Sequence, residues 1–182
     1  MFLICGLGNK GFEYKYTRHN IGYLVVDRCS ERYNIHLGQR RYGCIFGRKG
    51  DVVLAKPDTY MNISGGPVSM LLKHMAIGLE CLILVHDDLD MDLGRIRIKW
   101  NGGDGGHKGV RSVVDSLGSS NFCRVKIGIG RDPSMLPEEF VLCRFRPEEM
   151  TIVDASIDKA VDAIDTFITK GKDTAMSIYN RP

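Results

Sequence analysis

The opening residues constrain the fold most strongly, because they place a short buried strand directly before a glycine-rich polar loop. Residues 2–5 form the continuous apolar run FLIC, which is typical of a strand covered on both faces. Gly6, Gly8 and Gly11 follow and satisfy the G-x-G-x-x-G spacing of a dinucleotide-binding turn. That turn requires a helix to open at the glycines.

The residues after the glycines do not fit such a turn. Aromatic and charged residues alternate over 12–16, and the first helical pattern begins only near Asn20. Asp27 lies inside that pattern, so no acidic residue ends a second strand as the dinucleotide motif demands. We therefore interpret residues 6–19 as a loop that presents polar side chains, and we reject the nucleotide-binding oxidoreductase.

The length and composition predict one globular domain over residues 1–182. No low-complexity linker or internal repeat divides the 182 residues, which suffice for one well-buried core. The net charge of +3 is modest, so a nucleic-acid partner must be argued from the positions of the charges.

The six cysteines contain no C-x-x-C pair, which argues against a zinc site. Most lie in apolar runs, where a reduced cysteine acts as a small hydrophobe. No apolar run approaches the roughly 20 residues of a membrane span, and the N-terminus lacks the pattern of a signal peptide. We expect a cytoplasmic protein with no membrane contact.

Helical and strand patterns alternate along the rest of the chain. Amphipathic helices are predicted over residues 20–33, from about 64 to 75, from about 108 to 117 and over 148–170. Strands are predicted over 42–47, 51–56, 81–88, 95–100 and 122–130, while the proline-containing residues 131–147 are predicted to form a loop or lid. Strands mixed with covering helices predict a single three-layer α/β domain.

A histidine and an aspartate are the strongest candidates for chemistry. His19 lies in the polar loop after the first strand, and Asp87 ends the apolar run CLILV. An imidazole with a reference pKa near ~6.5 acts as a general base when a carboxylate orients it. Because ligand chemistry collects at the carboxyl ends of strands, we expect these two side chains to share one crevice and to activate water.

A metal site at HDDLD is the alternative interpretation of the same acidic stretch. Asp88, Asp90 and Asp92 with His86 could bind a divalent ion. Nothing else in the chain repeats a ligand spacing, and these carboxylates also suit a solvated turn. We predict no metal.

Two asparagines and a methionine lie at strand ends and could contact a substrate. Asn9 and Asn62 can donate to a carbonyl or a developing oxyanion, although asparagine is also a common turn residue. Met61 would add soft apolar contact, or simply fill the core.

Basic residues gather in one part of the sequence and suggest a phosphate partner. Arg95, Arg97 and Lys99 share one face of the predicted strand, and a glycine loop then leads to a helix N-terminus. Helix N-termini bind anions, although an exposed charge row is often plain solvation. Other members of this basic group are His107, Lys108, Arg111, Lys126 and Arg131.

Four long motifs, in order and over nearly the whole chain, resemble the bacterial-type peptidyl-tRNA hydrolases. They are GLGNKGFEYKYTRHNIG, KPDTYMNISG, HDDLDMDLGRIRIKWNGGDGGHKGVRS and FCRVKIGIGR. The resemblance implies a mixed sheet between helices and a metal-free, cofactor-free monomer. It also implies hydrolysis of the ester that joins a peptide to the 3′ end of tRNA.

Carried over by motif, the resemblance assigns a role to each candidate residue. His19 resembles the base that activates water, Asp87 its partner carboxylate, and Asn9 the residue that reads the peptide part. The substrate shell would include Tyr14, Tyr60, Met61 and Asn62, and the basic group around Lys99 would hold the phosphates of the tRNA acceptor stem.

Three positions depart from the family pattern. Lys10 replaces the usual proline, so the turn that holds Asn9 is expected to be less rigid. Lys108 replaces asparagine in GGHKG, and Lys126 replaces a frequent arginine. Lys10 and Lys108 leave one alternative open, a non-catalytic RNA-binding paralogue on the same fold.

Overall fold

The computed structural model describes residues 1–181, and its strands form one mixed sheet in the order β2-β3-β4-β1-β5-β7-β6. Strands β4, β1, β5 and β7 are parallel, while β2, β3 and β6 run antiparallel to their neighbours. The strand bounds are β1 Phe2–Gly6, β2 Gln39–Arg41, β3 Cys44–Lys49, β4 Val52–Pro57, β5 Leu82–Asp88, β6 Ile96–Trp100 and β7 Cys123–Gly128.

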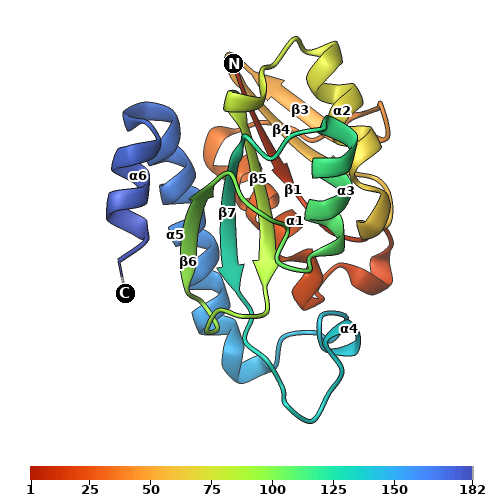
Figure 1. Cartoon of the computed structure of the whole chain (residues 1–182), viewed down its shortest axis with the longest axis vertical. Coiled ribbons are helices and arrows are strands. Elements are labelled where there is room, and N and C mark those ends of the chain that lie inside the picture. The colour runs from red at the N-terminus through yellow and green to blue at the C-terminus, as the bar shows by residue number, and fades with distance from the viewer. Residues whose placement is uncertain (182) are drawn as a thin grey trace.

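Helices cover both faces of this sheet (Figure 1). Helices α1 (Ile21–Tyr33) and α5 (Met150–Lys170) pack on one face, and α2 (Gly65–His74) and α3 (Lys108–Leu117) pack on the other. Helix α6 (Lys172–Tyr179) contacts α5 and β6, and the short α4 (Pro137–Phe140) lies in the predicted loop or lid. This arrangement confirms the predicted three-layer α/β class. The 3₁₀ turns are η1 Phe12–Tyr14, η2 Arg18–Asn20, η3 Met61–Ile63, η4 Leu79–Cys81 and η5 Pro147–Glu149.

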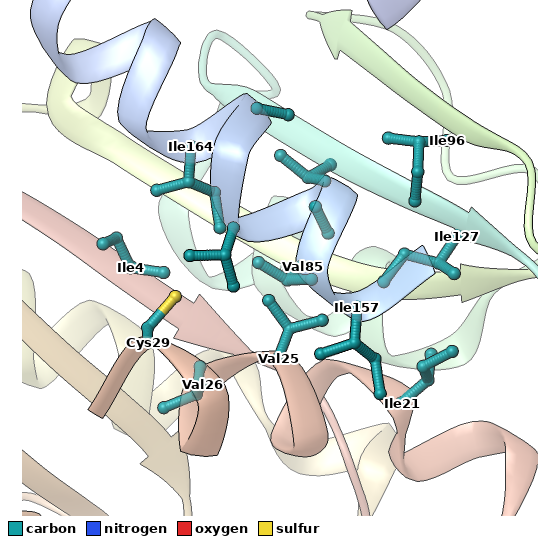
Figure 2. Close-up of a cluster of buried hydrophobic side chains, with 14 of the residues drawn as sticks. Ile4, Ile21, Val25, Val26, Cys29, Val85, Ile96, Ile127, Ile157 and Ile164 are labelled. Atoms are coloured by element: carbon teal, nitrogen blue, oxygen red, sulfur yellow. The ribbon is translucent and has the colours of Figure 1, made fainter. Parts of the chain in front are cut away.

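Alternate residues of the central strands enter two separate cores. Ile4 and Val85 face α1 and α5, where they pack with Val25 and Ile164 (Figure 2). Leu3 and its neighbours on the opposite face pack against α2 and α3. A parallel strand covered on both faces needs apolar residues at every position, which explains the continuous runs FLIC and LILV.

Besides the short helix α4 within the predicted loop, two elements were not predicted from the sequence. Strand β2 is exposed along its whole length, so it carries no apolar alternation that could reveal it. Helix α6 buries only Ala175 completely, and its hydrophobic face is therefore weak. No helix within residues 1–181 is long and apolar enough to cross a membrane.

Two glycines bring the start of α1 against the end of β1. A Cβ atom on Gly6 would collide with the backbone oxygen of Gly22, and one on Gly22 would collide with the backbone of Leu7 and Val85. Without side chains the two elements approach closely, and Leu7 N–H donates to Val85 C=O at 2.9 Å. The turn η2 is thereby held beside the carboxyl ends of β1 and β5.

Candidate active site

A cleft of about 600 Å³ opens where β1 and β5 end. It is bordered by the loop after β1, the turn η3, the start of α3 and the segment that contains α4. Ten residues that the sequence predicted to be catalytic, substrate-binding or phosphate-binding line it: Asn9, His19, Met61, Asn62, Asp87, Arg97, His107, Lys108, Lys126 and Arg131. Tyr14, Tyr60, Lys99 and Arg111 are not part of its lining.

The structure brings His19 and Asp87 into direct contact. His19 Nδ1 lies 2.8 Å from Asp87 Oδ1 and 3.0 Å from Oδ2, so Nδ1–H donates to the carboxylate and Nε2 is left as the acceptor. The His19 backbone N–H donates to Val141 C=O at 2.8 Å, which ties the backbone of His19 to the end of α4. The predicted convergence of these two side chains is therefore present.

Asp87 is charged although it is buried, with 2% of its surface exposed. Burial alone would raise its pKa, but the neighbouring imidazoles of His19 and His107 together outweigh this effect and hold the pKa well below its usual range. The site therefore keeps a permanent carboxylate beside His19.

His107 lies at the N-terminus of α3, as the sequence predicted, but its ring contacts the helix backbone and Asp87. Its Nδ1 accepts hydrogen bonds from Gly109 N–H and Val110 N–H at 3.1 and 3.2 Å, and its Nε2 lies 2.9 Å from Asp87 Oδ1. The anion site predicted at the N-terminus of α3 does not form in this way, because two of its backbone donors already bind this ring.

Asn9 is held by a residue that sequence reasoning missed. Asn20 donates to Asn9 C=O at 2.9 Å and accepts from Asn9 N–H at 2.9 Å. The Asn9 side-chain oxygen in turn accepts from Met61 N–H at 2.8 Å, so the amide nitrogen of Asn9 remains available to a ligand. An asparagine just before a helix normally caps that helix. The sequence therefore did not indicate that Asn20 holds the backbone of Asn9 instead.

Lys10 does not leave the Asn9 turn unsupported. Its backbone N–H donates to Thr59 C=O at 3.0 Å, a bond that the family's usual proline could not make. Its ammonium group lies 5.3 Å from the centroid of the Tyr60 ring. The expected loss of rigidity is thus offset by an added hydrogen bond.

A metal ion does not suit the donor atoms of this cleft. Ligand atoms of His19, Asp87 and His107 lie within 4.8 Å of one another, yet His107 Nε2 must carry a proton because Nδ1 accepts two N–H groups. In HDDLD, Asp88 pairs with Lys126 and Asp90 pairs with Arg131 at 2.7 Å. These carboxylates are neutralised by cations of the chain itself.

The basic group divides into paired and unpaired members. Arg111 is bound to Asp104 at 3.1 Å and Lys126 to Asp88, whereas Lys99 and Lys108 form no ion pair within residues 1–181. Desolvation, followed by nearby cations of which Arg124 contributes most, lowers the pKa of Lys99. Arg95 and Arg97 likewise form no ion pair within these residues and are exposed, so these four cations are the members of the group available to a phosphate.

Arg124 is a second buried residue that no sequence pattern marked. Its guanidinium donates to the carbonyls of Asn101, Gly102 and Gly103 at 2.6, 2.6 and 2.7 Å. Arg124 therefore holds the glycine loop that leads to α3, but it does not line the cleft itself.

Arg18 anchors the segment after α4 to the site. Its guanidinium lies between the rings of Phe140 and Phe145, with 4.4 and 4.9 Å to their centroids, and one of its nitrogens contacts both Glu149 oxygens at 2.7 and 3.0 Å. Sequence reasoning missed this residue too, because its partners lie more than 100 positions away.

The described residues form a three-layer α/β domain in which a histidine–aspartate pair and an anchored amide lie at the carboxyl ends of parallel strands. This is the class of α/β proteins that bind ligands in a crevice at that edge of the sheet. A family model described as "Peptidyl-tRNA hydrolase" matches residues 3–182. The chain belongs to the peptidyl-tRNA hydrolase family.

Individual relatives agree with this placement. Curated proteins named peptidyl-tRNA hydrolase are similar over the full length: that of Thermodesulfovibrio yellowstonii is 42% identical, covering 100% of both chains, and that of Pseudothermotoga lettingae is 40% identical, covering 99% and 97%. Two crystal structures of peptidyl-tRNA hydrolase from Acinetobacter baumannii, a point mutant and another form, are 37% identical. Their TM-scores are 0.93 and 0.90, and the matches cover 99% and 97% of this chain and 94% and 93% of theirs.

Proposed function

We propose that this protein hydrolyses the ester bond between a peptide, or an N-blocked aminoacyl group, and tRNA. The contact between His19 Nδ1 and Asp87 Oδ1 at 2.8 Å carries the proposal, because it leaves His19 Nε2 free to accept a proton from water inside the cleft. Membership of the peptidyl-tRNA hydrolase family supports the choice of substrate.

The reaction follows from the positions of these groups. His19 Nε2 takes a proton from water, and the hydroxide attacks the ester carbonyl carbon. The tetrahedral oxyanion then collapses, the bond to the ribose oxygen breaks, and that oxygen takes the proton back from His19. The products are free tRNA and a peptide carboxylic acid, which loses its proton to solvent, and Asp87 stabilises the imidazolium between the two steps.

Asn9 and its neighbours are proposed to hold the peptide part. The Asn9 side-chain oxygen is occupied by Met61 N–H, so its amide nitrogen would donate to a substrate carbonyl or to the oxyanion. Asn62 and Met61 line the same cleft, with Tyr14 and Tyr60 proposed as outer contacts of the substrate.

The tRNA is proposed to bind through its acceptor stem and 3′ end, with Lys99 and Lys108 as the principal phosphate contacts. His107, Arg111 and Lys126 were predicted to bind tRNA as well, but each already has a partner in the structure. Lys99→Ala and Lys108→Ala should each reduce the salt slope of tRNA binding by about 1. An unchanged slope in both variants would remove these residues from the interface.

The decisive experiment compares two substrates and two variants. The protein should release deacylated tRNA from N-acetyl-aminoacyl-tRNA and act poorly on the free-amine ester. His19→Ala should lower the rate by roughly 10²–10⁴, whereas His36→Ala, an exposed histidine outside the cleft, serves as the matched control. Tight RNA binding without ester cleavage by the unaltered protein would favour the non-catalytic paralogue instead.

The remaining features are proposed together. The protein would act as a monomer in the cytoplasm, without a cofactor. Light scattering of the purified protein, alone and with tRNA, measures the oligomeric state. Because no step of the proposed reaction uses a cofactor, the protein should keep its full turnover after dialysis against a chelator.

A further inference from the structure

We propose that His107 is a positioning residue for the reaction: its imidazole, oriented by the N-terminus of α3, fixes the rotation of the Asp87 carboxylate that orients His19. This inference rests on the proposed function, because it assigns His107 to the same site. It differs from the phosphate contact that the sequence suggested for this residue.

The backbone of α3 decides which nitrogen of His107 carries the proton. Gly109 N–H and Val110 N–H both point at Nδ1, at 3.1 and 3.2 Å, and only an unprotonated nitrogen can accept them. The neutral ring must then carry its proton on Nε2. A helix N-terminus thus sets the tautomer, a task that a carboxylate or carbonyl performs for many other histidines.

The protonated Nε2 is directed at the carboxylate. It lies 2.9 Å from Asp87 Oδ1, the same oxygen that accepts from His19 Nδ1 at 2.8 Å. Two donors on one oxygen, from η2 and from the start of α3, restrict the rotation of the carboxylate. Since the His107 side chain is 8% exposed and that of Asp87 is 2% exposed, water competes little for these bonds.

The other ionisable groups around Asp87 do not duplicate this role. The His86 ring packs 4.8 Å from the His107 ring, and burial lowers its pKa well below the ordinary value, so it stays neutral. Its Nδ1 donates to the Asp87 backbone carbonyl, not to the carboxylate. Lys126 is engaged with Asp88. His107 and His19 are thus the side chains that hold the carboxylate within residues 1–181.

Two substitutions test the roles of the two ring nitrogens of His107 separately. In His107→Asn the amide oxygen takes the place of Nδ1 and keeps the helix cap, but the side chain is too short to reach Asp87. In His107→Gln the amide NH₂ takes the place of Nε2 and can still donate to Asp87, while the cap is lost. Asp115→Asn, exposed on the same helix, is the matched control.

The expected results differ between the variants. His107→Asn should keep a melting temperature close to that of the wild type, yet lose roughly tenfold to 100-fold in kcat with little change in KM, as for loss of a hydrogen bond to a charged group. His107→Gln should melt earlier but recover at least part of that kcat. Asp115→Asn should change neither quantity.

Two further measurements distinguish a positioning role of His107 from a merely structural one: the pH dependence of kcat and the ring nitrogen of His107 that carries the proton. Without the His107 donor the Asp87 charge acts more strongly on His19, so the acid limb of the kcat profile should move to higher pH in His107→Asn and not in His107→Gln. Nitrogen-15 NMR of the wild type should show His107 protonated on Nε2 and not on Nδ1.

Each outcome has a separate meaning. Wild-type kcat and pH profile in His107→Asn, or a proton on Nδ1, would overturn the positioning role. If His19→Ala abolishes turnover while His107→Asn behaves as the wild type, this inference fails and the proposed function stands. If His19→Ala retains turnover, the proposed function itself fails.

Discussion

Replacing Asn20 by alanine tests how the site loop is held to α1. The side chain of Asn20 is 1% exposed and makes both hydrogen bonds to the backbone of Asn9, at 2.9 Å each. The substitution leaves one buried N–H and one buried C=O without a partner. Each such group costs about 1–3 kcal/mol, so the free energy of unfolding should fall by about 2–6 kcal/mol.

The measurement is urea unfolding together with turnover of N-acetyl-aminoacyl-tRNA. For a chain of this size about 1 kcal/mol corresponds to roughly 2–4 °C, so Asn20→Ala should melt at least about 4 °C lower. The kcat/KM should fall as well, because a displaced Asn9 no longer meets Met61 N–H.

The matched control is Gln39→Ala, which also removes an amide side chain but at an exposed position of β2, where that amide has no hydrogen-bond partner within residues 1–181. Its effect should remain within about 0.5 kcal/mol, as for most surface substitutions. If Asn20→Ala unfolds within that same margin and retains its turnover, the two hydrogen bonds do not hold the loop, and the reasoning is refuted.

Further predictions concern the carboxylate, the close packing and the anchor. Because the folded pKa of Asp87 is depressed, its contribution to stability is present above the unfolded value of about 3.9 and is lost as the pH falls toward the folded value. Urea unfolding from pH 5 downward should therefore show a steeper loss for the wild type than for Asp87→Asn, and equal slopes would contradict this. Gly6→Ala should cost about 1–3 kcal/mol or more, since its Cβ collides with a backbone oxygen of α1, whereas Gly66→Ala in the open first turn of α2 should be neutral or stabilising on thermal melting. Arg18→Met should lower the free energy of unfolding by about 1–3 kcal/mol by removing the charged partner of Glu149. Limited proteolysis should then cut first within residues 131–147, and an unchanged cleavage pattern would count against the anchor.

Local pattern determined the layers of this protein. The apolar runs FLIC and CLILV, together with the amphipathic helices predicted along the chain, were enough to predict buried strands between helical layers. The same pattern predicted that His19 and Asp87 meet, because the carboxyl ends of parallel strands lie at one edge of a sheet. The periodicity of a strand or helix alone determines which face each of its side chains points to.

The contacts that hold the site were decided only by the tertiary structure. Local sequence suggests a helix cap for Asn20 and surface charges for Arg18 and Arg124. In the structure each of these residues is buried against its hydrogen-bond partners. Arg18 reaches Glu149 across 131 positions, and His107 reaches Asp87 across 20. A hydrogen-bonding side chain has many possible partners within its reach, and no local spacing selects among them. The packing of helices on the sheet makes that selection, because it removes water and leaves each buried polar group with few remaining partners.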